Sequence, residues 1–484
     1  MSRHCIILST KDLLSLTRNA GVYRVATHLR NNGWNCDILE WFDLWEKADL
    51  ENYLRRHVTS NTKWIGISNT WIPHSYQTKK TLEILKETIE FIKSLDPDIL
   101  IVAGGQTPYD TCLGADYYVY GYAENALLKL LDYKFGNGKP IFYTKHLNGK
   151  LIDAVHTEPS VGLGNYEIAY QDNDFISDTE TLTIELGRGC KFSCDYCNFP
   201  FIGIKEDTST SEEYLYRELM TNYEKWGTTS YILADETIND RIEKLVKIKN
   251  VVNRLPFKPD FAAFTRLDLF RSHPEKIELM CEGRIWGQFY GIETLNHRTG
   301  KLIGKGLNPE YSKELLLKIR EYFLKNLGIY RGTVSMIAGL PYESIDSMRD
   351  SNKWLLENWS DQNVHWWPLQ IVKNGTMSAM GQDFTKYGYK EMLPGDPSFV
   401  PFSSNHSLNW KNEHTNYHGV NDLIETEFRP NEKFKMSAFR LMQVLPLVGL
   451  EHVTGLPQDY DRSLSFQKLV KSELNIYIDQ KKNS

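Results

Sequence analysis

Three of the seven cysteines in this 484-residue chain lie within eight residues of one another, and this group constrains the fold more than any other feature. Cys190, Cys194 and Cys197 follow a strand-like alternating run at 181–186 and a Gly-Arg-Gly turn. Their spacing lets three thiolates curve around one soft metal centre, and the glycines let the backbone approach it closely. Three ligands on a four-iron cluster leave one iron open, so we expect a [4Fe–4S] cluster that binds and reduces a ligand.

The pattern C-x3-C-x2-C, with the aromatic residue Tyr196 directly before the last cysteine, resembles the signature of radical S-adenosylmethionine (radical SAM) enzymes. The resemblance implies that the open iron chelates the methionine part of SAM, and that reductive cleavage yields a 5′-deoxyadenosyl radical that takes hydrogen from a substrate. It also implies an external one-electron reductant of the flavodoxin or ferredoxin type. The alternative is a structural zinc site, which needs a fourth ligand and more often shows paired C-x2-C knuckles. Disulfides fit less well, because the thiols are crowded and no secretion signal precedes them.

Composition indicates an ordinary globular protein of two or three domains. Hydrophobic residues make up 41% of the chain, and the formal net charge is −6, which argues against a nucleic-acid partner and favours a small-molecule or peptide substrate. The apolar stretch 441–450 is too short and too interrupted to cross a membrane. Because a strand-like run begins within the first residues, with no room for a signal peptide, we expect a cytoplasmic location.

Residues 1–140 alternate between strand-like and helix-like patterns. Apolar runs predict strands at 5–8, 36–39, 64–68 and 99–103, and helical spacing predicts helices over 22–29 and 82–92. Such alternation predicts a parallel, doubly wound sheet of the Rossmann-like type, with ligands beyond the carboxyl ends of the strands.

Small residues follow two of these expected strands: Ser68 and Thr70 after the third, and Gly104 and Gly105 after the fourth. Together with the later stretch 121–124 (Gly-Tyr-Ala-Glu), they resemble the cobalamin-binding domain that precedes the barrel in one large radical SAM class. The resemblance implies that the hydroxyl groups and glycines lie along the nucleotide tail of cobalamin. The D-x-H-x-x-G motif, which supplies a histidine ligand in many cobalamin proteins, is missing. The alternative is a flavodoxin-like domain that keeps the fold and binds nothing.

Residues 141–180 predict a linker that contains a hairpin at Asn148-Gly149. From 181 to 380, six candidate strands alternate with helices, as in a partial (β/α)6 barrel, whose site lies at the C-terminal ends of the strands. The candidate strands are 182–186, 231–234, 261–264, 289–292, 333–338 and 367–372. We expect residues 381–484 to form an α-rich extension that caps the open side of the barrel.

Charged residues follow several barrel strands at positions that match the radical SAM pattern. Asp235 and Glu236 follow the second strand, where the resemblance implies that a carboxylate binds the methionine ammonium. Arg266 follows the third strand and would meet the SAM carboxylate with a bidentate fork. Glu293 ends the fourth strand in a G-x-E pattern and would meet the amino-acid or ribose part of SAM. With Tyr196, these residues are the candidate SAM contacts.

Two further stretches match the same class. Lys305-Gly306 corresponds to a K-G pair that often follows the fourth strand, and 339–344 (Gly-Leu-Pro-Tyr-Glu-Ser) is close to the class motif G-L-P-G-E-T. The resemblance implies that the strand before this motif pairs with adenine.

The combined resemblance implies a cobalamin-dependent radical SAM enzyme that methylates an unactivated carbon. The alternative is a radical rearrangement or cyclisation in the same fold, with the first domain as scaffold. A non-enzymatic iron–sulfur protein would explain the cysteines but not Asp235, Arg266 and Glu293. Methylthio transfer to RNA fits poorly, because the other N-terminal cysteines lie on separate elements. The sequence does not specify the substrate.

Overall fold

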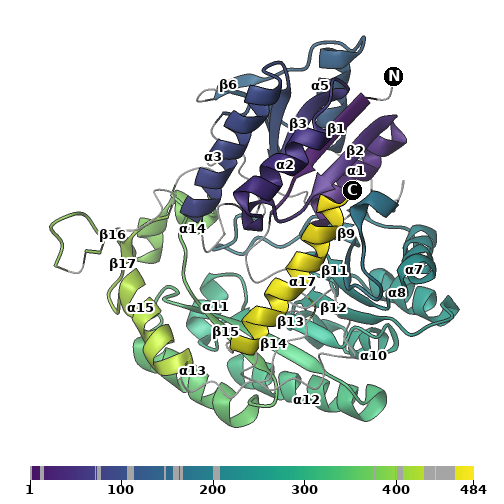
Figure 1. The fold of residues 1–484 in the computed structure, drawn as a ribbon. Coiled ribbons are helices and arrows are strands. Elements are labelled where there is room, and N and C mark those ends of the chain that lie inside the picture. Colours follow the sequence, from purple (N-terminus) through teal and green to yellow (C-terminus); the bar gives the residue numbers. More distant parts are fainter. Residues whose placement is uncertain are drawn as a thin grey trace.

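Two parallel β-sheets, each flanked by helices, form the upper and lower parts of the molecule in Figure 1. The computed structural model describes residues 3–10, 16–70, 72, 78–105, 114–146, 149–155, 163, 167–199, 208–373, 377–397, 399–400, 407–429, 442 and 464–484. Residues 430–441 and 443–463 of the expected α-rich extension lie outside the described residues, as does Asn148 of the expected hairpin.

The first sheet has the strand order β2-β1-β3-β4-β5-β7-β6, and every neighbouring pair is parallel except β7 and β6. This confirms the expected Rossmann-like fold. Its strands are β1 (Arg3–Leu8), β2 (Trp34–Leu39), β3 (Thr62–Ser68), β4 (Leu100–Gly105), β5 (Tyr117–Tyr120), β6 (Thr144–His146) and β7 (Gly149–Asp153). Its helices are α1 (Ala20–Asn31), α2 (Lys47–His57), α3 (Thr78–Leu95) and α5 (Glu124–Phe135). The strands are continuous apolar runs because helices cover both faces of the sheet.

The hairpin of β6 and β7 belongs to this sheet, because β7 pairs with β5. The backbone N–H of Ala154 then donates to the carbonyl of Tyr120 over 2.9 Å. The hydrogen bonds of the first sheet therefore continue to Ala154, beyond the boundary at 140 expected from the sequence. Local turn chemistry identified the hairpin but could not show which sheet edge it joins.

The second sheet has the order β15-β14-β13-β12-β11-β8 with all pairs parallel, and its two edge strands do not pair with one another. It is the expected six-stranded partial barrel. The strands are β8 (Leu182–Glu185), β11 (Ser230–Ala234), β12 (Asp260–Thr265), β13 (Gly287–Glu293), β14 (Arg331–Ala338) and β15 (Asn363–Pro368). The main connecting helices are α7 (Glu212–Trp226), α8 (Ile242–Arg254), α10 (Glu275–Glu282), α12 (Pro309–Leu327) and α13 (Ile345–Asn358).

The sixth strand lies four residues before its expected position of 367–372. In β15, Val364 and Trp366 are buried, whereas His365 and Trp367 are more exposed. This alternation is typical of a strand with one covered face. The apolar residues after Pro368 led to the wrong register in the sequence-based prediction.

The C-terminal helix α17 (Leu464–Lys482) returns to the first domain (Figure 1). Tyr477 packs edge-on against Trp41, with ring centroids 5.0 Å apart. Near its end, Lys481 donates a 2.6 Å hydrogen bond to the carbonyl of Asn173. The side chains of Tyr477 and Lys481 on α17 therefore pack on the first domain and the segment that follows it.

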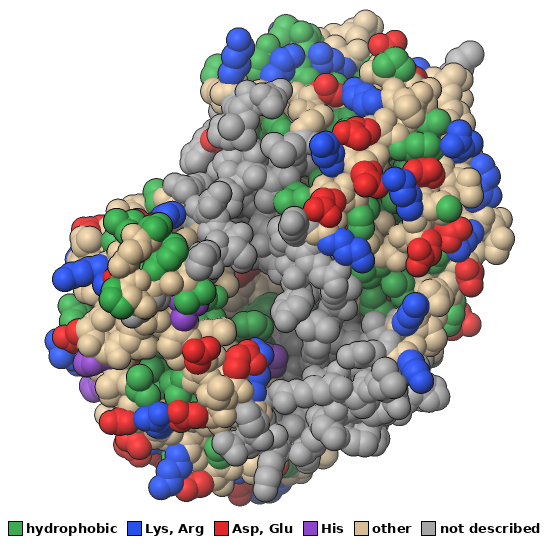
Figure 2. Space-filling view, turned by 60° about the vertical axis from the view of Figure 1, so that its left-hand side comes forward, with side chains coloured by type: hydrophobic (Ala, Val, Ile, Leu, Met, Phe, Trp, Pro, Cys, Tyr) green, Lys and Arg blue, Asp and Glu red, His purple; other side chains and the backbone are tan. Residues whose placement is uncertain are grey.

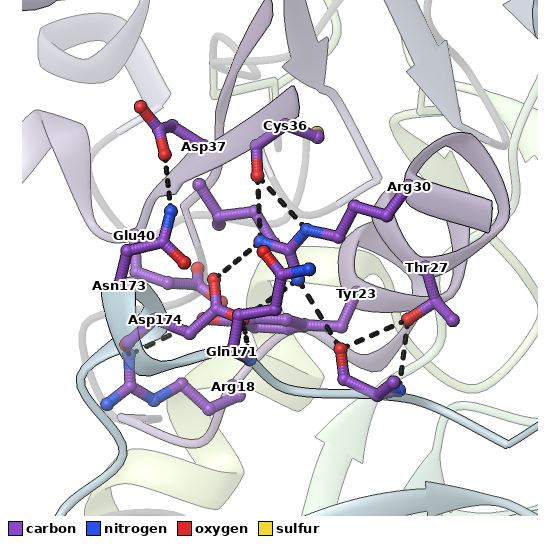
Figure 3. A network of polar contacts seen from close by, with 12 residues as sticks. Arg18, Tyr23, Thr27, Arg30, Cys36, Asp37, Glu40, Gln171, Asn173 and Asp174 are labelled. Atoms are coloured by element: carbon purple, nitrogen blue, oxygen red, sulfur yellow. Dashed lines mark hydrogen bonds and ion pairs between the residues drawn. The ribbon is translucent and has the colours of Figure 1, made fainter. Parts of the chain in front are cut away.

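Residues 172–180, expected to be part of a linker, form a buried polar network with the first domain (Figure 3). Arg30 makes a 2.9 Å ion pair with Asp174, and Arg18 makes a 2.7 Å ion pair with Glu180. All four side chains are almost fully buried. Removing one partner of such a pair typically costs about 3–5 kcal/mol, so this network fixes the first domain against the chain that enters the barrel.

Candidate functional site

The cysteine loop begins where two short strands pair, β9 (Gly187–Arg188) and β10 (Thr208–Ser209). Gly189 then has a φ of 102°, a backbone conformation that favours glycine, and turns the chain into the loop. Cys190, Cys194 and Cys197 follow as free, half-buried thiols.

Each of the three sulfurs receives a hydrogen bond from nearby protein. Arg266 Nη1 lies 3.2 Å from Cys194 Sγ, and the backbone N–H of Phe199 lies 3.4 Å from Cys197 Sγ. The side chain of Thr237 makes a hydrogen bond to the side chain of Cys190. Donors of this kind stabilise thiolates and tune the reduction potential of an iron–sulfur cluster.

Burial raises the pKa of Cys190, and it raises the pKa of Cys197 to about 11, so burial disfavours the thiolate form of these two residues when no iron is bound. No three His, Cys, Asp or Glu side chains in the described part of the chain lie close enough to share one metal ion. A multi-iron cluster does not need that proximity, because each thiolate binds its own iron.

Glu293, at the end of β13, lies directly across from the cysteine loop. The Tyr196 hydroxyl donates a 2.8 Å hydrogen bond to Glu293 Oε1, and Lys305 Nζ lies 3.7 Å from the same oxygen. A Cβ on Gly291 would come within 2.6 Å of this oxygen, which explains the glycine of the G-x-E pattern. Glu293 has a φ of 69°, and such strain in a residue other than glycine is concentrated at functional sites.

The two adjacent carboxylates after β11 have different roles in the structure. Asp235 is buried, makes a 2.7 Å ion pair with Lys244 on α8, and accepts from the backbone N–H of Thr237. The Glu236 side chain is exposed, but the protein around it displaces part of its water. This desolvation, together with the charge of Asp235, raises the pKa of Glu236 to about 7. It also acts electrostatically on Cys190, so it lies near the cluster loop. Of the pair, Glu236 is the carboxylate left to meet a ligand.

Arg266 lies beside the cysteine loop, as expected, but its fork is already engaged. The guanidinium lies 3.9 Å from the centroid of the Phe192 ring and makes hydrogen bonds of 2.8 and 3.0 Å to Asp268. A SAM carboxylate would therefore have to share this arginine with Asp268 and Cys194. The contacts of Asp268 and Phe192 were not apparent from the sequence.

The loop after β14 departs from the class motif at Tyr342, which replaces a glycine. Tyr342 has a φ of 59°, so the left-handed turn that favours glycine is kept at a cost in strain. Arg298, on α11 (His297–Leu302), lies 4.6 Å from the Tyr342 ring centroid. The following Glu343 accepts a 2.8 Å hydrogen bond from Thr294. This hydrogen bond links the turn after β14 to Thr294, the residue that follows Glu293.

The segment that follows the barrel holds the cysteine loop from outside. Tyr387 donates a 2.7 Å hydrogen bond to the carboxylate of Asp195, and the backbone N–H of Met380 donates to the Asp195 carbonyl over 2.9 Å. Asp195 lies between two of the cysteines, so these contacts position the loop. Their partners are more than 180 residues away in sequence, and no local pattern could have revealed them.

The inner face of the barrel carries a row of aromatic rings. Phe264 pairs with Phe289 across β12 and β13, with centroids 5.2 Å apart, and His365 and Trp367 continue the row on β15. Phe264 and Trp367 are 38% and 49% exposed, whereas Trp366 faces the helices and is buried. A hollow with hydrophobic side chains inside it opens on the face shown in Figure 2. The row is a candidate wall for the substrate.

The four residues predicted to contact cobalamin line one cavity of about 190 Å³ in the first domain. Ser68, Thr70, Gly104 and Gly105 line it together with apolar side chains of β1, β3, β4 and β5. Gly105 has a φ of 146°, and a Cβ there would come within 2.8 Å of the Thr70 hydroxyl. The size and the apolar part of the lining suit the bicyclic base of the cobalamin tail, so the residues present fit this group.

The cavity is also lined by Glu185 and Arg188 of the barrel, which the sequence did not single out. Arg188 lies two residues before Cys190, so the cavity and the cluster loop adjoin. Glu185 is a charged residue at the C-terminal end of β8, and this position in the sequence could have identified it as a candidate site residue.

Family models match two parts of the chain. The model of the Radical SAM superfamily matches residues 184–355, and the model of the B12 binding domain matches residues 12–131. A protein of Pyrococcus horikoshii, described as an uncharacterized methyltransferase, is 23% identical over 278 residues. The match covers 54% of this chain and 59% of that relative, less than two thirds of its length.

Solved structures share the fold. TsrM from Kitasatospora setae, a radical S-adenosylmethionine methyltransferase, matches with a TM-score of 0.66 and 13% identity over 95% of this chain and 90% of its own. OxsB, a cobalamin-dependent S-adenosylmethionine radical enzyme, matches with a TM-score of 0.59 and 15% identity over 79% of this chain and 56% of its own. These likenesses show the same order of sheets and helices.

Radical SAM domains use a [4Fe–4S] cluster and SAM, and B12 binding domains hold cobalamin, in agreement with the cofactors expected from the sequence. Among the described helices, none is long and apolar enough to span a bilayer. The chain belongs to the radical SAM superfamily and carries a B12 binding domain before its radical SAM domain.

Proposed function

We propose that this protein methylates an unactivated carbon of a small-molecule or peptide substrate by cobalamin-dependent radical SAM chemistry. One observation carries the proposal: the cavity of the B12 binding domain is lined in part by Arg188, two residues before the first cluster cysteine. Two cofactors held in these places would face one reaction space. The methyltransferase description of the Pyrococcus relative and the likeness to TsrM support the same reaction.

The cluster with SAM supplies a radical that removes hydrogen from the substrate, and cobalamin supplies the methyl group. Cys190, Cys194 and Cys197 hold the cluster. Glu236 is placed to bind the methionine ammonium, and Arg266 is placed to bind the SAM carboxylate. These assignments of individual residues stay predictions.

Glu293 is placed to meet the amino-acid or ribose part of SAM, while Tyr196 and Lys305 hold its carboxylate in position. Asp235 takes no direct part in this proposal, because Lys244 occupies its carboxylate. An external one-electron reductant completes the system.

The aromatic row at Phe264, Phe289 and Trp367 favours a substrate with a flat or apolar part near the reacting carbon. TsrM was solved with tryptophan as substrate, which has such a part. On the described surface in Figure 2, Lys and Arg side chains alternate with Asp and Glu, as suits a substrate that is not a polyanion.

Cobalamin uptake by anaerobically reconstituted protein tests the proposal. We expect about one equivalent of hydroxocobalamin per chain, with a corrin absorption spectrum, and 5′-deoxyadenosine once dithionite, SAM and substrate are present. Among the described residues, a Cβ on Gly104 would meet only the Val119 carbonyl, at 3.8 Å, so Gly104→Leu should extend into the cavity without a backbone clash there. This variant should lose most cobalamin affinity, Gly104→Ala should lose less, and both should keep the cluster.

Absence of any cobalamin binding, with the cluster and SAM binding intact, would contradict methyl transfer. The function would then be a radical rearrangement or cyclisation in which the first domain is a scaffold or a substrate wall.

A further inference from the structure

Four charged side chains alternate in sign across the junction between the two domains. Arg24 on α1 makes a 2.8 Å ion pair with Glu185 on β8, and Glu185 makes a 2.5 Å ion pair with Arg188 on β9. Arg188 in turn pairs with Glu124, the first residue of α5. The side chains are at least 88% buried, and the four charges cancel.

Two atoms of this chain of ion pairs have no partner among the described residues. Arg188 Nη1 and Glu124 Oε2 are both buried and make no hydrogen bond there. Both residues line the cavity of the first domain. A buried donor and a buried acceptor left unpaired in residues that line a cavity are costly unless a ligand satisfies them.

We propose that Arg188 and Glu124 together bind one primary carboxamide of cobalamin, with Nη1 donating to the amide oxygen and Oε2 accepting from the amide nitrogen. The inference rests on the proposed use of cobalamin. A primary amide offers an acceptor and a donor on one carbon and adds no charge to a balanced junction. Acetamide and propionamide groups of this kind surround the corrin ring.

A phosphate fits this position less well, because its negative charge would lie against Glu124. The location of the pair also favours the ring over the tail. Glu185 and Arg188 line the cavity from the barrel, whereas the apolar lining that suits the base of the tail comes from β1, β3, β4 and β5 of the first domain.

The contact would position the cofactor as well as hold it. Arg188 lies two residues before Cys190, and its guanidinium is fixed by Glu185 and by the Tyr122 ring, 4.2 Å away. A corrin amide bound to Arg188 would therefore be held at a fixed position relative to the cluster loop. Arg188 and Glu124 act as positioning residues for the methyl-transfer reaction.

Equilibrium titration of two corrinoids into anaerobic, cluster-loaded protein tests the inference. Hydroxocobalamin carries the ring amides and the nucleotide tail, whereas dicyanocobinamide carries the ring amides without the tail. We expect Glu124→Gln and Arg188→Lys each to weaken both corrinoids by about tenfold or more, since each loses a charge-assisted hydrogen bond. The iron content of Glu124→Gln should not change, because it lies on the other domain.

Glu218 on α7 provides a matched control. It is a buried glutamate with one unpaired oxygen, like Glu124, but it does not line the cavity. Glu218→Gln should bind both corrinoids with wild-type affinity.

Each outcome decides between alternatives. Wild-type affinity of both variants for both corrinoids would overturn the inference and leave the proposed function standing. If the variants bind hydroxocobalamin more weakly but dicyanocobinamide with wild-type affinity, Arg188 and Glu124 contact the nucleotide tail, and the assignment to a ring amide is overturned. A wild-type protein that binds neither corrinoid would overturn the proposed use of cobalamin, and this inference with it. If Arg188→Lys loses its cluster, the corrinoid affinities of Glu124→Gln still test the inference, because Glu124 lies on the first domain.

Discussion

The Tyr196 hydroxyl donates a 2.8 Å hydrogen bond to Oε1 of Glu293, which joins the cysteine loop to the end of β13. Lys305 lies 3.7 Å from the same oxygen and also donates to the carbonyl of Gly291 over 2.7 Å. The carboxylate is therefore held by Tyr196 of the cysteine loop and by Lys305, which follows α11 and is itself anchored to β13. Preorganisation of this kind lowers the cost of ordering side chains when a ligand binds.

Replacing Tyr196 by Phe should weaken SAM binding while leaving the cluster in place. The variant loses one hydrogen bond, which is worth about 1 kcal/mol, so SAM affinity should fall about fivefold. SAM titration of the reduced cluster, followed by electron paramagnetic resonance, measures the change. Loss of iron from this variant would show that the hydroxyl supports the loop itself, contrary to this expectation.

Substitution of any one of Cys190, Cys194 and Cys197 by alanine should abolish the intact cluster. The wild-type protein should hold about four irons per chain after anaerobic reconstitution. Cys281 is the control, because it is buried on α10, away from the loop. Cys281→Ala should keep the full iron content. A full cluster in the triple alanine variant would contradict the assignment.

The sequence predicted those parts of the site that depend on local patterns. Alternating runs gave the parallel strands, and neighbouring parallel strands end at the same edge of a sheet. For this reason Ser68, Thr70, Gly104 and Gly105 line one cavity. The spacing of three cysteines after a glycine turn likewise located the cluster loop without reference to distant residues.

Contacts between distant segments could not be predicted in the same way. Asp235 and Glu236 are adjacent carboxylates, and only the position of Lys244 shows which one is occupied. Arg24 and Glu185 are 161 residues apart in sequence, so their ion pair depends on how the two domains pack.

Truncating Tyr477 to alanine should destabilise the protein through the first domain. The side chain is buried against Trp41, and its hydroxyl accepts from the backbone N–H of Glu40 over 3.0 Å. Loss of a buried aromatic side chain typically costs about 3–5 kcal/mol. Thermal melting of the cluster-loaded protein measures the loss. Ile476→Ala is the matched control, because Ile476 is 53% exposed, and an equal loss in both variants would contradict the packing of α17.

The burial of Glu343 predicts that stability falls between about pH 5 and pH 8. Burial raises the pKa of this carboxyl to about 8, above its ordinary value, so the folded protein holds a proton that the unfolded chain releases. The stabilising contribution of the protonated group is complete below about pH 4.5 and is lost as the pH rises through 8. Glu343→Gln keeps a neutral group at every pH. Its melting temperature should therefore rise relative to wild type from pH 6 to pH 8, and a constant difference would contradict the buried neutral carboxyl.

Matched substitutions of Asp235 and Glu236 should separate stability from SAM binding. Asp235→Ala removes the 2.7 Å ion-pair partner of the buried Lys244 and should cost about 3 kcal/mol, because it breaks a buried ion pair. Glu236→Gln changes an exposed side chain, so its melting temperature should match wild type. It removes the carboxylate proposed to meet the methionine ammonium, and SAM affinity should fall about tenfold. Melting curves and SAM titrations of both variants check this split. Unchanged SAM binding by Glu236→Gln, or a larger loss of SAM affinity in a folded Asp235→Ala protein, would assign the ammonium contact to another residue.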